Sequence, residues 1–369
     1  MDVVELTQEL VRINSENPPG NEKNVARYIN DYLNDKGIKT EIVEYSPNRF
    51  NVVADIGSGD GLLLNGHLDT VPIGDKEKWE QGPLSGKIFG DNLFGRGSGD
   101  MKGAVAAMIK TVEMLSKQAL KRRVVLALVA DEEGGRFSGT NWLLKNRKEF
   151  FNGIKYGVVG ESTSNKVRTS QKGFVFAKIK FYGKSAHGSK PDLGINAISN
   201  AIKFGLELEN LFLKLKSNPR PILGNGTINI GTIKGGLNVN IVPDYCEMEV
   251  DRRLVDNENV SDFVSQMKEI LNSLGIKSDT DFIGRNPMVV SENSAIVKML
   301  LEAGADGIVS GSKFGYTEAE LYSSAFGIEC VVCGPGDITL AHAPNEFVSI
   351  KRLRASETIY TNLVKKWCC

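Results

Sequence analysis

The chain has 369 residues, which is long for one domain and natural for two, and its 41% hydrophobic content is enough to build real cores. Its 45 basic and 45 acidic residues give a formal net charge of zero, which argues against a binder of nucleic-acid phosphates. No apolar run approaches the ~20 residues of a membrane span, the N-terminus does not resemble a signal peptide, and the five cysteines are sparse, so we expect no membrane partner and a cytoplasmic location.

The first half of the chain alternates between helical and strand-like segments. A capping Asp2 precedes a helix, Pro18-Pro19-Gly20 breaks it, and a second helix is expected from Asn21 to Gly37. A further helix is expected over 101–117. Near-continuous apolar strands are expected at residues 50–56, 62–65, 124–130 and 156–159. This alternation predicts an α/β sheet with helices on both faces.

After about residue 170 the pattern changes. Residues 173–183 alternate apolar and polar side chains, as in a sheet with one solvated face. A long helix over 195–216, strands over 226–234 and 245–254, and a helix over 260–274 complete a small α+β module. The α/β pattern resumes after about residue 285 and ends in a helix over 350–367. We therefore predict one α/β domain, residues 1–171 and 285–369, interrupted by an α+β domain of residues 172–284.

The chain has only three histidines: His67, His187 and His342. Each lies in or beside a glycine-rich turn, and none lies on a helix stripe where it could serve as a core residue. One such histidine alone would favour a structural interpretation, whereas all three together favour a functional one.

Carboxylates follow the predicted strands at sharp turns. Asp69 comes two residues after His67, where its carboxylate could hold the second imidazole nitrogen. The others are Asp100, Glu132, Glu133 and Glu161. In open α/β sheets ligands bind beyond the carboxyl ends of the strands, so these groups should converge at one edge. Several carboxylates cannot lie together ionised without cations, and this donor set suits a pair of zinc or cobalt ions.

Two of these motifs have plainer interpretations. The segment Gly95–Asp100 could be a phosphate loop, but it lacks the Lys-Ser/Thr ending of that motif. An adjacent pair such as Glu132-Glu133 is usually surface charge, but this pair directly follows an apolar strand and precedes two glycines.

Seven motifs occur in order along nearly the whole chain: GHLDTVP, a Trp79 segment, GRGSGDMKG, DEEGG, VVGES, GKSAH and GPG…AHAPNE. Together they resemble the acetylornithine deacetylase / succinyl-diaminopimelate desuccinylase / carboxypeptidase family of metallohydrolases, the M20 peptidases. The resemblance implies a zinc-peptidase-like catalytic domain and an inserted lid and dimerisation domain. It also implies a homodimer.

The resemblance also implies a role for each matching residue. His67 and Glu161 would hold one metal ion, Glu133 and His342 the other, and Asp100 would bridge the two. Glu132 would be the general acid/base, with Asp69 and His187 as further catalytic residues. Substrate contacts would come from Arg253, which would grip a carboxylate, and from Asn240, Gly334 and Gly336.

The exact substrate stays open. Thr317-Glu318-Ala319 is similar to the acetylornithine deacetylase pattern, whereas desuccinylases more often carry Thr-Ser-Asp-Gly-Arg there. An N-acyl-amino-acid deacylase of amino-acid biosynthesis is the first interpretation, and a metallocarboxypeptidase or dipeptidase is the second. A catalytically inactive relative kept as a binding or scaffold protein is a third, and the intact ligand set argues against it.

Overall fold

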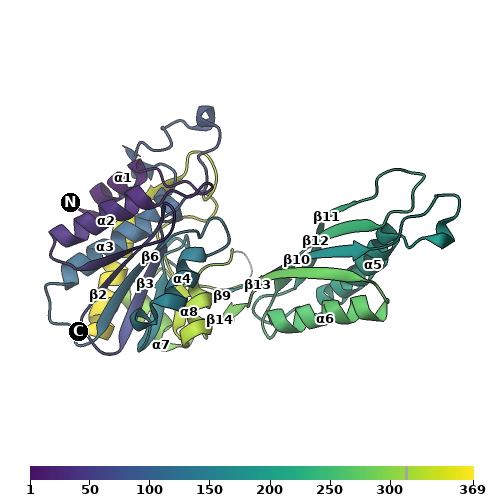
Figure 1. The fold of residues 1–369 in the computed structure, drawn as a ribbon. Helices are drawn as coiled ribbons and strands as arrows, with labels where there is room; N and C mark the ends of the chain where they lie inside the picture. Colours follow the sequence, from purple (N-terminus) through teal and green to yellow (C-terminus); the bar gives the residue numbers. More distant parts are fainter. Residues whose placement is uncertain (312–314) are drawn as a thin grey trace. The chain divides into compact units, whose positions relative to one another are not determined.

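The computed structural model describes residues 1–311 and 315–369, and it divides into two compact units (Figure 1). The first unit comprises Met1–Thr169, Val290–Val309 and Thr317–Cys369, and the second comprises Ser170–Val289 and Ser310–Tyr316. The expected insert, residues 172–284, lies inside the second unit. The grouping of Ser310, Gly311, Gly315 and Tyr316 with the second unit was not predicted from the sequence. Among the described residues, no helix combines the length and apolarity needed to cross a membrane.

The first unit is built on a mixed sheet of eight strands, counted over the described residues. Their order is β1-β2-β6-β3-β7-β16-β8-β15. The central strands β6, β3, β7 and β16 are parallel, and β2 pairs antiparallel with both β1 and β6. The bounds are β1 (Thr40–Ser46), β2 (Arg49–Ile56), β3 (Gly61–His67), β6 (Arg123–Val129), β7 (Ile154–Val159), β8 (Val167–Arg168), β15 (Ile308–Val309) and β16 (Glu329–Val332).

Helices cover both faces of this sheet, so the α/β prediction is confirmed. One face carries α1 (Val3–Arg12), α2 (Lys23–Asp35), α3 (Gly103–Leu115), α7 (Ala295–Ala303) and α9 (Ile350–Cys368), which share one apolar cluster with the strands. Two further helices, α4 (Ser138–Asn146) and α8 (Ala319–Phe326), contact each other. A small sheet of β4 (Lys87–Phe89), β5 (Asn92–Phe94) and β17 (Phe347–Ser349) lies outside the main one.

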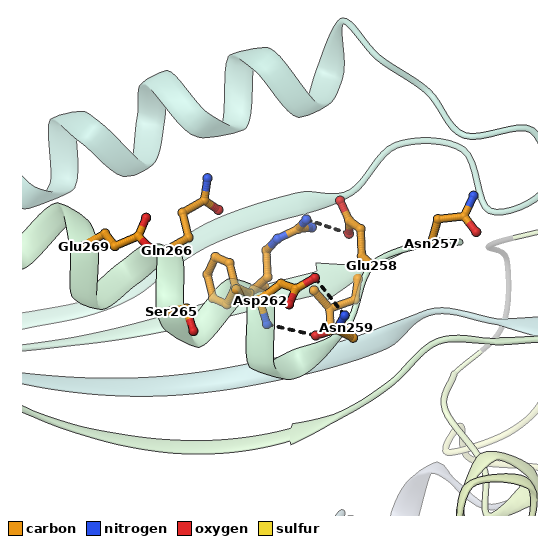
Figure 2. Close-up of a pocket in the computed structure, with 10 residues that line it drawn as sticks. Asn257, Glu258, Asn259, Asp262, Ser265, Gln266 and Glu269 are labelled. Atoms are coloured by element: carbon orange, nitrogen blue, oxygen red, sulfur yellow. Dashed lines mark hydrogen bonds and ion pairs between the residues drawn. The ribbon is translucent and has the colours of Figure 1, made fainter.

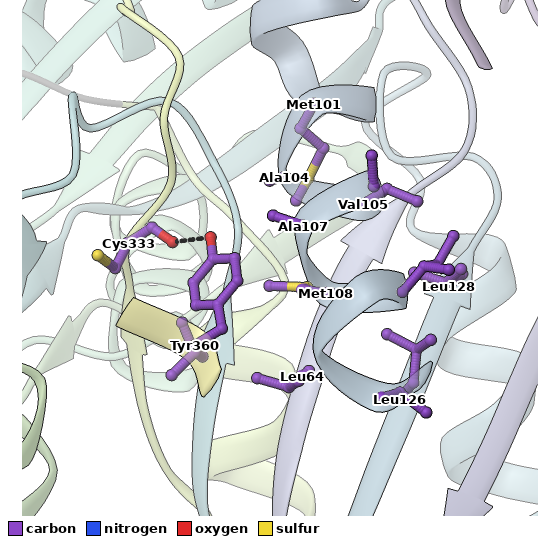
Figure 3. Close-up of a cluster of buried hydrophobic side chains, with 14 of the residues drawn as sticks. Leu64, Met101, Ala104, Val105, Ala107, Met108, Leu126, Leu128, Cys333 and Tyr360 are labelled. Atoms are coloured by element: carbon purple, nitrogen blue, oxygen red, sulfur yellow. Dashed lines mark hydrogen bonds between the residues drawn. The ribbon is translucent and has the colours of Figure 1, made fainter. Parts of the chain in front are cut away.

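The sequence gives local reasons for these elements. The Asp2 carboxylate accepts hydrogen bonds from the main-chain nitrogens of Val4 and Glu5, and Glu5 completes a capping box at the start of α1. Every residue of β3 is buried, because the strand lies at the centre of the sheet. In the core, Met101, Val105 and Met108 pack with strand residues that include Leu64 and Leu128 (Figure 3). Full burial of each such side chain contributes about 1.5–3 kcal/mol.

The second unit has a four-stranded antiparallel sheet in the order β11-β12-β10-β13. Its strands are β10 (Gly173–Tyr182), β11 (Thr227–Gly235), β12 (Tyr245–Leu254) and β13 (Ser278–Arg285). Two helices, α5 (Ala197–Lys216) and α6 (Val260–Ser273), share an apolar cluster with the sheet. Burial alternates along β10 and β12, as the apolar/polar alternation of the sequence predicts. Two short strands, β9 (Ser170–Gln171) and β14 (Met288–Val289), pair with each other.

Candidate metal centre

His67 ends the buried strand β3, and its side chain is fully buried. Its Nε2 lies 3.3 Å from Asp100 Oδ1 and 3.3 Å from Glu161 Oε1. Its Nδ1 lies 2.9 Å from the main-chain carbonyl oxygen of Asp69, which can only accept a hydrogen bond. The proton therefore belongs on Nδ1, which leaves the Nε2 lone pair directed at the carboxylates, the arrangement of a metal-ligating histidine.

The predicted contact from the Asp69 carboxylate to His67 needs correction. Asp69 Oδ1 is 3.8 Å from His67 Nδ1, beyond hydrogen-bonding distance, and the main-chain carbonyl makes the contact instead. The carboxylate accepts hydrogen bonds from the main-chain nitrogens of Glu132, at 3.2 Å, and Glu133, at 3.1 Å. Asn17 Nδ2 donates a third at 2.8 Å. Asp69 thus holds the turn that carries the two glutamates.

Asp100 lies between the two histidines. Its Oδ1 faces His67, and its Oδ2 lies 3.6 Å from His342 Nε2. His342 Nε2 is also 3.0 Å from Glu133 Oε2. His342 has a positive φ of 64°, a conformation that non-glycine residues rarely adopt and that occurs at functional sites.

Two overlapping groups of possible ligand atoms result. The atoms of His67, Asp100 and Glu133 lie within 4.8 Å of one another, and so do those of His67, Glu132 and Glu161. The structure therefore brings together all the predicted ligands of the first unit, with His342 joined through Glu133 and Asp100. It also places Glu132, predicted as the acid/base, close enough to His67 and Glu161 for the three side chains to share one metal ion.

The electrostatics of this cluster fit cations. Burial and the nearby charge of Asp100 raise the pKa of Glu133 to about 7. Burial and Glu161 raise the pKa of Glu132 well above its usual value. The hydrogen bond that His342 donates to the Glu133 carboxylate raises the pKa of His342 to about 9. Burial thus disfavours the ionised forms of these two glutamates, and divalent ions held by nitrogen and oxygen donors would stabilise them.

Glu318 is a buried acid that the sequence analysis did not assign to the site. Its side chain is fully buried at the start of α8, and neither carboxylate oxygen has a hydrogen-bond partner among the described residues. Burial, together with the nearby Glu161, raises its pKa to about 8. The Thr317-Glu318-Ala319 motif was the only signal in the sequence, and it did not indicate burial.

Gly334 and Gly336 have a visible packing role. A Cβ atom at Gly334 would clash with the main-chain oxygen of Gly160, and one at Gly336 would clash with that of Gly99. Glycine at both positions therefore lets this loop lie directly against the segments that carry Glu161 and Asp100. Their predicted contact with substrate stays a prediction.

The other predicted site residues belong to the second unit. His187 is exposed, and its Nδ1 lies 2.7 Å from Ser189 Oγ. Asn240 is also exposed, and its main-chain oxygen accepts a hydrogen bond from the nitrogen of Gly188 at 2.7 Å. His187 and Asn240 therefore lie on adjacent loop segments of that unit.

The tertiary structure distinguishes the two adjacent arginines of β12. Arg252 is buried and pairs with Glu258 at 2.7 Å, beside a polar cavity of about 400 Å³ whose rim includes Glu258 and Asp262 (Figure 2). Arg253 points to the opposite face of the sheet, where its side chain is 39% exposed. Asp251 accepts its hydrogen bond at 3.0 Å, and the Phe176 ring lies 5.6 Å below its guanidinium. Of the two arginines, Arg253 is therefore the more accessible to a ligand, although Asp251 already pairs with it.

The buried imidazole of His67, the exposed imidazole of His342 and a group of carboxylates gather near the carboxyl ends of parallel strands, and together they define a metallohydrolase-type centre. The sequence profile of peptidase family M20/M25/M40 matches residues 63–366, and the chain belongs to this family. It is therefore a hydrolase of a metal-dependent family.

Curated relatives and solved structures agree with this assignment. The chain is 29% identical to "Acetylornithine deacetylase" of Edwardsiella ictaluri, over 91% of this chain and 89% of that protein. It is 26% identical to "Probable succinyl-diaminopimelate desuccinylase" of Staphylococcus aureus, over 94% and 92%. The fold is similar to that of an M20 family metallo-carboxypeptidase from Sulfolobus solfataricus, with a TM-score of 0.76, 21% identity and 99% coverage of both chains.

Proposed function

We propose that the protein is a dinuclear-metal hydrolase that cleaves the amide bond of N-acyl amino acids, as an acetylornithine deacetylase or succinyl-diaminopimelate desuccinylase does. The observation that carries the proposal is the pair of ligand groups that share His67. The names of the curated relatives support a deacylase, and zinc or cobalt suits the nitrogen and oxygen donors.

In this proposal His67 and Glu161 hold one ion, Glu133 and His342 hold the other, and Asp100 contributes to both. When bound, the two ions supply Lewis acidity that polarises the amide carbonyl and makes water a better nucleophile. Asp69 accepts hydrogen bonds from the main-chain nitrogens of Glu132 and Glu133 and so fixes the turn between them. In this fixed turn Glu133 can act as a metal ligand and Glu132 as the general acid/base.

Glu132 takes a proton from the attacking water and delivers it to the leaving amine, which must be protonated because an amide anion is a very poor leaving group. His187 donates a hydrogen bond to the developing oxyanion. Arg253 binds the free carboxylate of the amino acid through its planar fork, and Asn240 makes a further contact with the substrate.

A hydrolysis panel tests the proposed reaction. N-acetyl amino acids, N-succinyl amino acids and dipeptides are assayed with added zinc or cobalt. We expect an N-acyl amino acid to give the highest kcat/KM. Faster cleavage of dipeptides would support the second candidate function, that of a carboxypeptidase or dipeptidase. The metallo-carboxypeptidase from Sulfolobus solfataricus, whose fold is similar to that of this chain, motivates this candidate. Metal binding without any hydrolysis would favour an inactive relative.

Carboxamide versions of the best substrate serve as the control for carboxylate recognition. Amidation should lower kcat/KM by the equivalent of roughly 2–5 kcal/mol, the range for a desolvated charge left without its partner. The same amidation should matter little in Arg253→Ala, and a partial effect is expected in Arg253→Lys, which keeps the charge but loses the fork. Equal sensitivity in all three proteins would assign Arg253 a structural role.

We further propose that the protein forms a homodimer through the second unit. Ile202, Leu206 and Leu213 lie on one stripe of α5 and are 53%, 60% and 61% exposed. Helix α5 packs against β11, which is one of the two edge strands of the sheet among the described residues and carries the half-exposed Ile233. An apolar stripe beside an open strand edge suits pairing with a second copy about a two-fold axis.

Such a dimer would let His187 act in the neighbouring subunit, and subunit complementation tests this. Inactive Glu132→Ala and inactive His187→Ala proteins are mixed under conditions that allow exchange. If His187 acts across the interface, each mixed dimer regains one intact site, and random pairing restores roughly a quarter of wild-type activity.

Exchange is verified independently with differently tagged subunits, and each variant alone is the control. If exchange occurs and activity stays at the level of the single variants, His187 serves its own subunit. A monomer in solution would contradict the dimer itself.

A further inference from the structure

The Glu346 carboxylate is buried, at 1% exposure, and accepts hydrogen bonds from three main-chain nitrogens. Oε1 accepts from Gly99 and from Asp100, both at 3.0 Å, and Oε2 accepts from Gly97 at 3.1 Å. Oε2 also lies 2.8 Å from Arg96 Nη1. Both oxygens of the Glu346 carboxylate therefore accept hydrogen bonds from one short segment, residues 96–100. This segment ends at Asp100, the proposed bridging ligand.

Arg96 extends these contacts to the other ligand loop. Its Nη1 donates to the main-chain oxygen of Ala343 at 3.2 Å, and its Nη2 donates to that of His342 at 3.4 Å. Nη2 also reaches the Pro72 oxygen at 3.3 Å, and the guanidinium lies 5.1 Å from the Trp79 ring. Arg96 thus holds the main chain of His342 while Glu346 holds that of Asp100.

Regular secondary structure does not fix these two segments. Gly97 is left-handed with φ of 80°, and Asp100 departs from helical geometry with φ of −123° and ψ of 91°. His342 is left-handed as well. Main-chain nitrogens in such a turn lack the partners that a helix or strand would supply, so an outside acceptor decides their placement. Glu346 is itself anchored, because its main-chain oxygen accepts from Gly95 and β17 pairs with β5 directly after it.

We propose that Arg96 and Glu346 form a positioning pair that sets Asp100 relative to His342 and thereby determines the affinity of the metal position held by Glu133 and His342. The inference rests on the proposed two-metal function. A pair kept only for stability would have no reason to direct its contacts to these two ligand segments, and buried ion pairs contribute little net stability on average. Partners that orient metal ligands typically change metal affinity 10–100-fold when removed.

The test is metal binding by the apo protein, measured by calorimetric titration with Zn²⁺ and by the visible absorption of the Co²⁺ form. Wild type should bind two equivalents. Glu346→Gln keeps the size of the side chain but can place an amide NH₂ against the main-chain nitrogens. The equivalent held by Glu133 and His342 should then weaken about 10–100-fold, and the other equivalent, which shares Asp100, should weaken less. Saturating metal should then recover most of kcat.

Two further variants complete the design. Arg96→Lys keeps a charge for Glu346 but loses the fork that reaches the His342 loop, so it should weaken the same equivalent, and it serves if Glu346→Gln does not fold. Glu113→Gln neutralises the carboxylate paired with Lys110 at 2.6 Å on α3, outside the site, and should leave both equivalents unchanged.

Two results would count against the proposals in different ways. If wild type binds two ions and Glu346→Gln and Arg96→Lys bind both equally well, with only a lower unfolding temperature, the pair is structural and the positioning inference is wrong. If wild type itself does not bind two ions, the proposed two-metal function is wrong.

Discussion

Removal of divalent metal should abolish turnover, and added zinc or cobalt should restore it. His67, Asp100, Glu133, Glu161 and His342 gather with no positive side chain among them except the histidines. Burial and the charge of Asp100 raise the pKa values of Glu133 and Glu161, so a nearby cation would stabilise their ionised forms. Without the ions the amide carbonyl has no Lewis acid, and this contribution is large. The measurement is kcat/KM after dialysis against a chelator, before and after metal is returned.

A chelator that inactivates by unfolding would mimic this result. Circular dichroism of the apo protein controls for it, because the apolar core of α3 and its neighbouring strands does not include the ligands. Full activity in a preparation shown by mass spectrometry to be metal-free would overturn the proposed function.

Glu132→Ala should lower kcat by about 10²–10⁴-fold, the usual contribution of a general acid/base, while both ions stay bound. Glu133→Ala should instead weaken the position that Glu133 shares with His342 Nε2, which lies 3.0 Å from its Oε2. Both variants are compared by metal content and by kcat at saturating metal. Glu132→Gln is the matched control, since it keeps the shape of the side chain and removes only its capacity to accept a proton.

This comparison is needed because Glu132 lies close enough to His67 and Glu161 to be a metal ligand itself. Loss of an ion in Glu132→Ala with both ions retained in Glu133→Ala would mean that the two roles are reversed. Loss of an ion in both variants would make both glutamates ligands, and another group would then have to move the proton.

Much of the fold follows from local patterns in the sequence. The apolar stripe and Asp2 cap predict α1, which the structure places at Val3–Arg12, and the alternation of residues 173–183 predicts β10, found at Gly173–Tyr182. The turns that carry His67, Glu132 and Glu161 were found for the same reason, since each follows a strand of continuous apolar residues. Side-chain periodicity and capping act over a few residues, and that range can be read from a sequence.

Local patterns therefore predicted the type of fold, the family motifs and the residues capable of the chemistry. The contacts between their atoms emerged only once the chain was folded. The tertiary structure showed that Asp69 presents its carbonyl, not its carboxylate, to His67, and that Arg253 is partly exposed whereas Arg252 is buried. It also showed Glu318 to be buried with no hydrogen-bond partner among the described residues, and Glu346 to hold the turn of Asp100, from 246 residues away in the chain. Contacts of that separation depend on how distant segments pack, and no local pattern records them.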